Sequence, residues 1–94
     1  MVEGVDRIRR RVTVSGRVQG VGFRDGVRRE AERLHVAGWV ANTGDTGLEA
    51  VLEGAPDDVT TLLDYCHQGP DGAQVSEIDV QTQEPSGLEG FAVR

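Results

Sequence analysis

The sequence is poor in several residue types, and each shortage excludes a class of protein. A single cysteine, Cys66, allows neither a disulfide within the chain nor a cysteine cluster around a metal. No apolar run approaches the roughly 18–20 residues of a membrane-spanning helix, and the N-terminus lacks the apolar segment of a signal peptide. A chain of 94 residues makes one domain with one hydrophobic core. We therefore expect a single cytoplasmic domain over residues 1–94, with no membrane partner and with a flexible leader at residues 1–7.

Lysine is absent, so all ten basic residues are arginines, and they are distributed unevenly. Residues 1–40 hold nine arginines against five acidic residues, whereas residues 41–94 hold one arginine against eleven acidic residues. The net charge of −6 argues against nonspecific binding of nucleic acid, because such binding needs several cationic contacts with phosphates. The basic first half is still compatible with a local site for a small anionic ligand.

The spacing of apolar residues predicts alternating strands and helices. Alternation of apolar and polar residues predicts strands over residues 8–15, 38–42, 48–53, 77–82 and 91–93. Apolar residues three or four positions apart predict a helix over residues 23–34, with Phe23, Val27, Ala31 and Leu34 on its buried stripe. A second helix is predicted from Pro56 to the residue before Gly69, with Val59, Leu62, Leu63 and Cys66 buried.

The order of these elements predicts the fold. Two strand–helix–strand units whose inner strands form a hairpin are typical of the split βαβ or ferredoxin-like sandwich. We therefore expect an α+β domain in which an antiparallel sheet carries two helices on one face. The same fold serves RNA-recognition domains, which stack bases on aromatic side chains of their central strands. The predicted first and third strands contain no aromatic residue, so RNA is not an expected partner.

The glycine-rich loop of residues 16–22, between the first strand and the first helix, is the main candidate for a binding site. Backbone N–H groups in such a loop, together with the positive end of the following helix, bind oxyanions. Arg24 follows directly, and its planar guanidinium can bind two phosphate oxygens. From composition and spacing alone, the glycines could equally well only turn the chain, and Arg24 could be one of several solvated helix arginines.

The actual string of residues favours the anion site. Residues 16–24, Gly-Arg-Val-Gln-Gly-Val-Gly-Phe-Arg, closely resemble the signature of the acylphosphatases, and residues 38–42, Gly-Trp-Val-Ala-Asn, resemble the second block of that family. The resemblance extends over residues 8–94. It implies an enzyme that hydrolyses acyl phosphates to carboxylate and inorganic phosphate. It also implies that the reaction needs no metal or other cofactor and forms no covalent intermediate. We separately expect this enzyme to be a monomer.

The resemblance further implies roles for individual residues. Arg24 and the loop amides would hold the phosphate, and Asn42 would orient the attacking water. The implied phosphate-binding residues are Arg17, Val18, Gln19, Gly20, Val21, Gly22 and Arg24. Because an amide is not basic at neutral pH, Asn42 can hold a water through its carbonyl oxygen but cannot deprotonate it. The proton would then pass to the phosphate of the substrate.

Two positions depart from the pattern of the family. Residue 41 is Ala41, where relatives often carry a basic or polar residue, and we expect weaker substrate contacts at the rim of the site. The hairpin turn ends Asp45-Thr46-Gly47, which shifts the turn glycine by one place and is expected to alter the hairpin geometry. A similar domain begins the hydrogenase-maturation carbamoyltransferases. Their zinc-finger and transferase segments are absent here, but a domain serving a larger assembly remains the alternative to a free-standing enzyme.

Four further residues are interpreted as structural. His35 and His67 fall at the predicted C-terminal ends of the two helices, which favour cations, and neither has a second ligand at metal spacing. Cys66 lies on an apolar stripe and is expected to pack rather than react. Trp39 is expected to support the hairpin in a partly buried position.

Overall fold

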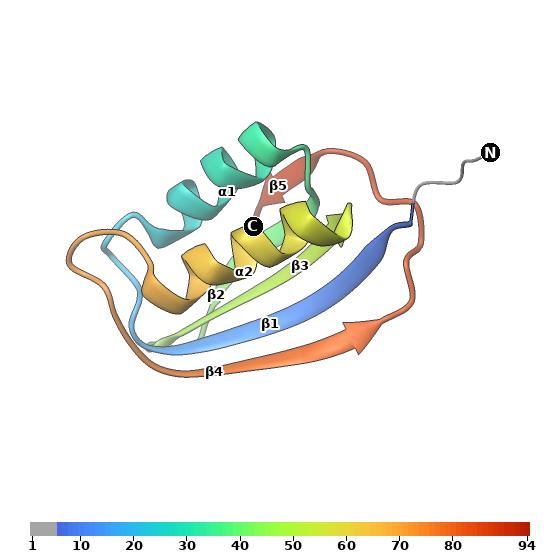
Figure 1. The fold of residues 1–94 in the computed structure, drawn as a ribbon. Helices are drawn as coiled ribbons and strands as arrows, with labels where there is room; N and C mark the ends of the chain where they lie inside the picture. Colours follow the sequence, from blue (N-terminus) through green and yellow to red (C-terminus); the bar gives the residue numbers. More distant parts are fainter. Residues whose placement is uncertain (1–5) are drawn as a thin grey trace.

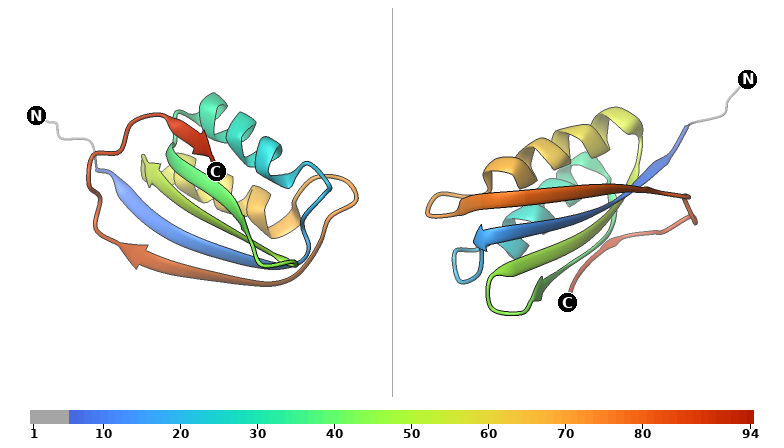
Figure 2. Two further views of the ribbon diagram at one scale, coloured as in Figure 1. Left: turned by 180° about the vertical axis from the view of Figure 1, so that it is seen from behind. Right: turned by 90° about the horizontal axis from the view of Figure 1, so that it is seen from below.

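The computed structural model describes residues 6–94 and shows a five-stranded sheet with both helices on one face (Figures 1 and 2). Its elements are, in chain order, β1 (Ile8–Arg17), α1 (Phe23–Leu34), β2 (Ala37–Thr43), β3 (Gly47–Gly54), α2 (Pro56–Gln68), β4 (Gln74–Gln83) and β5 (Phe91–Val93). The strand order is β4-β1-β3-β2-β5. The predicted α+β ferredoxin-like sandwich is confirmed. Residues 1–5 of the expected leader lie outside the described residues, while Arg7 at its end forms an ion pair with Glu53.

The sheet is mixed rather than wholly antiparallel. β1 pairs antiparallel with β3 and β4, and β2 pairs antiparallel with β3. β5 pairs parallel with β2, with Gly38 opposite Phe91 and Val40 opposite Val93. Parallel neighbours need a long connection, and residues 84–90 carry the chain from the edge strand β4 around to the far edge of the sheet. The expected antiparallel sheet is therefore wrong for β5, because the alternation of a three-residue strand says nothing about its direction.

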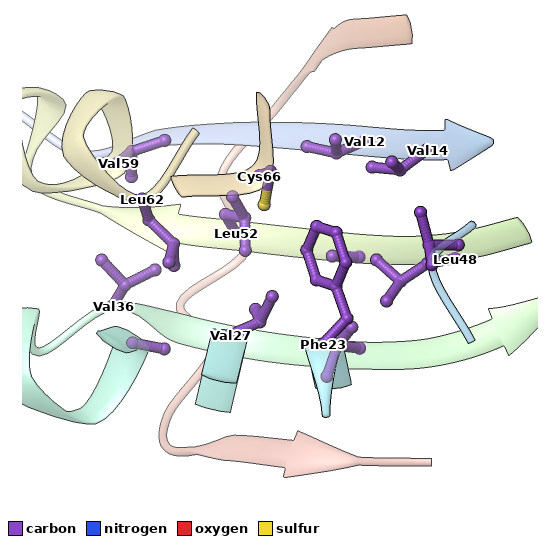
Figure 3. Close-up of a cluster of buried hydrophobic side chains, with 14 residues drawn as sticks. Val12, Val14, Phe23, Val27, Val36, Leu48, Leu52, Val59, Leu62 and Cys66 are labelled. Carbon is purple, nitrogen blue, oxygen red and sulfur yellow. The ribbon is translucent and has the colours of Figure 1, made fainter. Parts of the chain in front are cut away.

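The hydrophobic core fills the space between the sheet and the two helices (Figure 3). Most predicted stripe residues are buried in it, whereas Leu34 and Leu63 are only partly buried. Phe23, the first residue of α1, is 1% exposed and meets the ring of Tyr65 edge-on, with ring centroids 6.0 Å apart. Burial of a side chain of this size contributes roughly 1.5–3 kcal/mol. Phe23 thereby fixes the end of α1 that follows the glycine-rich loop.

Two local predictions turn out differently in the strands. Leu48, Ala50 and Leu52 face the core as expected, but Glu53, which alternation places on the opposite face, is also completely buried. The β2–β3 hairpin is regular despite the shifted glycine, because Thr43 pairs with Gly47 and the left-handed residue is Gly44, with φ of 56°. The expected distortion of the hairpin is therefore not found.

The residues interpreted as structural lie where the sequence places them. His35 caps α1 in a left-handed conformation with φ of 57°, and His67 lies exposed in the last turn of α2. Cys66 is buried in the core, where desolvation raises the pKa of its thiol to about 12. Within residues 6–94, no three His, Cys, Asp or Glu side chains are grouped so that they could hold a metal ion. None of the helices described here has the length and apolar character needed to cross a membrane.

Candidate active site

The glycine-rich loop is shorter than the sequence predicts. β1 continues through Gly16 and Arg17, with a bulge between Ser15 and Gly16, so the loop begins at Val18. Gly16 has φ of 133°, and its N–H donates to the carbonyl of Thr46 at 3.0 Å. Gly16 therefore links β1 to the β2–β3 turn and does not present its amide to a ligand.

The main chain of residues 18–25 carries a run of unused N–H groups. The first hydrogen bond of α1 runs from the N–H of Gly26 to the carbonyl of Gly22 at 3.0 Å. No hydrogen bond found within residues 6–94 uses an N–H of residues 18–25 as its donor. Gly20 and Gly22 have φ of 76° and 81°, a conformation that glycine adopts without steric cost and that lets neighbouring amides converge. With the positive end of α1 behind it, this loop has the features of an anion-binding site.

A pocket of about 450 Å³ opens beside this loop. Its walls come from the β1–α1 loop, α1, β2 and β5, and its lining residues are Val18, Gly20, Gly22, Phe23, Arg24, Asp25, Arg28, Asn42 and Val93. The fold thus brings the two predicted catalytic residues, Arg24 and Asn42, to one cavity. Asn42 lies two residues beyond the buried Val40, on the sheet face that carries the helices. Its carboxamide is half-buried and has no hydrogen-bond partner among the described residues, so it is available to a water or ligand.

Arg24 is held in place by the end of the chain segment that follows β5. Its Nη1 donates to the main-chain oxygen of Arg94 at 3.0 Å. Arg94 is itself fixed, because its N–H donates to the carbonyl of Val40 at 2.8 Å and its guanidinium lies 4.5 Å from the ring centroid of Trp39. Sequence reasoning missed this contact because neither residue carries a pattern that pairs it with the other. Val93, which lines the pocket beside it, was missed for the same reason.

Three of the predicted phosphate-binding residues do not line the pocket. Arg17 is exposed at the end of β1, and Val21 is partly buried against the core. The Nε2 of Gln19 donates to three main-chain carbonyls of the β2–β3 turn at 2.9–3.3 Å, which ties the loop to the hairpin. Ala41 lies opposite Glu49 on the sheet face away from the helices and is also absent from the lining, so the expected weakening of the rim finds no support.

An ion pair lies on the wall of the pocket. Asp25 is 2.7 Å from Arg28 and 3.3 Å from Arg29, and Arg28 also contacts Glu32 at 2.9 Å. The hydrogen bond from Arg28 is the main reason that the pKa of Asp25 lies below its usual range. The carboxylate of Asp25 is therefore ionised but balanced by the guanidinium groups of Arg28 and Arg29, next to the loop amides described above. In the sequence, Asp25 stands out only as an acidic residue in the first turn of the helix, a position that the helix dipole favours.

Comparisons with known proteins decide the family. The family model described as acylphosphatase matches residues 10–93. The chain belongs to the acylphosphatase family. A relative named acylphosphatase from Thermococcus kodakarensis is 51% identical over 87 residues, which cover 93% of this chain and 96% of the relative. This acylphosphatase is an enzyme that hydrolyses acyl phosphates and releases inorganic phosphate.

Solved structures place this acylphosphatase in the same fold. The structure of an acylphosphatase from Coxiella burnetii superposes with a TM-score of 0.90 at 37% identity, covering 95% of this chain and 94% of that one. Full-length HypF in its phosphate- and nucleotide-bound form gives a TM-score of 0.86 at 25% identity, covering 98% of this chain but 12% of that one. The chain therefore matches the Coxiella acylphosphatase over nearly the whole length of both proteins, but it matches only a small part of the length of HypF.

Proposed function

We propose that this acylphosphatase works without a metal ion, binding the phosphoryl group through the loop amides of residues 18–22 and Arg24, with a water held by Asn42. The unused N–H groups of residues 18–25, on the same pocket as Arg24 and Asn42, carry this proposal. During phosphoryl transfer negative charge spreads over the three equatorial oxygens, and fixed amides and a guanidinium stabilise that charge. Arg24 keeps N–H groups free for the phosphate after one has bonded Arg94, since a guanidinium carries five.

Asn42 orients the attacking water but does not act as a base. Its side-chain oxygen accepts a hydrogen bond from the water, whose oxygen attacks phosphorus. The bond between phosphorus and the acyl oxygen breaks, and the carboxylate leaves with the electron pair. A carboxylate is a good leaving group and needs no acid, so the proton of the water passes to a phosphate oxygen. Orientation of two reacting groups is the main contribution asked of the protein.

Replacement of Asn42 separates the orientation of the water from the binding of the phosphate. We expect Asn42→Ala to lower kcat for benzoyl phosphate by about 100-fold, as loss of one positioned hydrogen-bonding group does elsewhere. The inhibition constant of inorganic phosphate should stay unchanged, because the loop amides of residues 18–22 and Arg24 remain in place. Arg33→Gln, which breaks an exposed ion pair with Glu30 at the other end of α1, is the control. Unchanged turnover in Asn42→Ala, or loss of activity in EDTA that Mg²⁺ restores, would contradict the proposal.

We also propose that the enzyme acts as a monomer, because one chain supplies Arg24, Asn42 and the loop amides, which are all the groups that the proposed reaction needs. Light scattering should then give a mass near 10.1 kDa at assay concentration, and a stable dimer would count against it. A cytoplasmic location stays a prediction of the sequence.

A further inference from the structure

Glu53 is a buried charge that takes no part in the reaction proposed above. Among the described residues, Glu53 is the only polar or charged residue that is buried, with an exposed fraction of 0%. It lies opposite Ala37 at one end of the β2–β3 pair, whereas Asn42 lies opposite Leu48 near the other end. Five residues of strand separate the two ends by about 17 Å. A direct role in catalysis is therefore excluded, and its burial needs another explanation.

The carboxylate of Glu53 binds main-chain N–H groups of the segment that precedes β5. It accepts hydrogen bonds from the N–H groups of Ser86, Gly87 and Leu88 at 3.0, 2.8 and 3.0 Å. Two guanidinium groups add ion pairs, that of Arg7 at 3.2 Å and that of Arg9 at 3.6 Å. Burial alone would raise the pKa of Glu53, but these N–H donors and Arg7 outweigh it and lower the pKa to about 2. The carboxylate of Glu53 therefore stays ionised at neutral pH.

The anchored segment decides where β5 lies. Residues 84–90 contain no helix or strand and lead directly into β5, which is only three residues long. A strand this short has few ladder bonds of its own, so its register on β2 depends on where the preceding residues are fixed. Because side chains alternate along a strand, a slip by one residue would turn Val93 away from the pocket and move the main-chain oxygen of Arg94 away from Arg24.

We propose that Glu53 is a positioning residue for the active site: by fixing residues 86–88 it sets the register of β5 on β2 and so holds Val93 and Arg94 beside Arg24. The contacts form a continuous path from Glu53 through residues 86–88 to β5, and from the main-chain oxygen of Arg94 to the guanidinium of Arg24. This inference rests on the proposed role of Arg24 in binding phosphate.

A purely structural Glu53 would give a different result from a positioning one. Glu53→Gln keeps the shape but loses the charge and places an amide against three N–H donors. We expect the KM for benzoyl phosphate and the inhibition constant of inorganic phosphate to rise about five- to tenfold, as when a hydrogen bond orienting a charged group is weakened. The value of kcat should change less. Assays run well below the melting temperature of the variant separate this effect from lost stability.

Glu49→Gln is the matched control. Glu49 lies on the same strand and also pairs with an arginine of β1, Arg11, but among the described residues the main-chain N–H groups of Ser86, Gly87 and Leu88 bond Glu53 and not Glu49. Its replacement should leave both constants unchanged. Equal changes in the two variants, or no change in Glu53→Gln while it remains folded, would overturn the positioning role.

A truncated chain tests the path itself. A chain ending at Ala92 lacks Val93 and Arg94, so Glu53→Gln in that background should cause no further rise in the inhibition constant. A rise by the same factor in both backgrounds would show that the effect does not pass through β5. If Glu53→Gln does not fold, Arg9→Gln takes its place, because Arg9 pairs with Glu53 and bonds the side chain of Ser86 at 2.8 Å. An unchanged inhibition constant in Arg24→Gln would instead refute the proposed function.

Discussion

The guanidinium of Arg24 donates a hydrogen bond to the main-chain oxygen of Arg94, 3.0 Å away, so the residue proposed to hold the phosphate is itself held by the residue after β5. This contact limits the conformations of a long side chain before any substrate arrives. An arginine with one N–H engaged can still direct a planar pair of N–H groups at two phosphate oxygens. A lysine has the same charge but cannot satisfy both demands with one fixed geometry.

We therefore expect Arg24→Lys to behave much more like a deletion than like a conservative change. The inhibition constant of inorganic phosphate should rise at least about tenfold, because a charge-assisted hydrogen bond is worth about 1.5–3 kcal/mol. Arg33→Lys, at an exposed ion pair with Glu30, should leave it unchanged. Competitive inhibition of benzoyl phosphate hydrolysis gives the constant, and near-normal phosphate affinity in Arg24→Lys would remove the argument from guanidinium geometry.

The loop glycines should matter for ligand binding as well as for stability. At Gly20 and Gly22 an added Cβ meets open space, so Gly→Ala acts only through their positive φ values of 76° and 81°. Forcing alanine into this region costs about 1–2 kcal/mol per residue. We expect Gly20→Ala to lose stability of this size in urea unfolding and also to weaken phosphate inhibition.

Gly44 provides the comparison for that experiment. It lies in the β2–β3 turn with φ of 56°, and an added Cβ there also meets nothing. Gly44→Ala should lose similar stability without any change in phosphate inhibition. Equal phosphate affinities in Gly20→Ala and Gly44→Ala would mean that the amides of residues 18–22 do not bind the phosphate.

Much of this site could be predicted from the sequence, for local reasons. The spacing of Phe23, Val27 and Ala31 fixes which side of α1 is buried, and a glycine-rich loop before a helix leads to an anion site by backbone geometry alone. Asn42 was found through the resemblance of residues 38–42, and the hairpin register then brings it to the same pocket. These features depend on residues close together in the sequence or on a recognised string.

The parts that could not be predicted depend on contacts between distant segments. Alternation along β3 places Glu53 with Glu49 on the outer face, and only the arrival of residues 86–88 and Arg7 makes that position buried. The parallel direction of β5 follows from the path of residues 84–90 around the sheet, which no spacing encodes. The contact between Arg24 and Arg94 follows in turn from the placement of β5.

The ion pair on the pocket wall should affect the binding of an anionic substrate. Arg28→Gln leaves the carboxylate of Asp25 balanced only by the exposed Arg29, so repulsion of the phosphoryl group increases. We expect a KM higher by about two- to fivefold, in keeping with the 0.2–1 kcal/mol of exposed ion pairs. Adding Asp25→Asn should restore the KM, because the repelling charge is then gone. A KM that stays raised in the double variant would assign the effect to Arg28 itself.

The charge of Glu53 should make folding stability depend on pH in the acid range. Its pKa is lowered from 4.5 to about 2 in the folded protein, so the unfolded chain takes up a proton at higher pH than the folded one. The contribution of this group is complete above pH 4.5 and is lost as the pH falls toward 2. It amounts to roughly 3 kcal/mol, because one pKa unit corresponds to about 1.4 kcal/mol. Urea unfolding of the parent and of Glu53→Gln at several pH values separates this contribution from those of the other carboxylates. The difference in unfolding free energy between the two proteins should shrink between pH 4.5 and 2.5. A difference independent of pH would mean that Glu53 is not held ionised by residues 86–88.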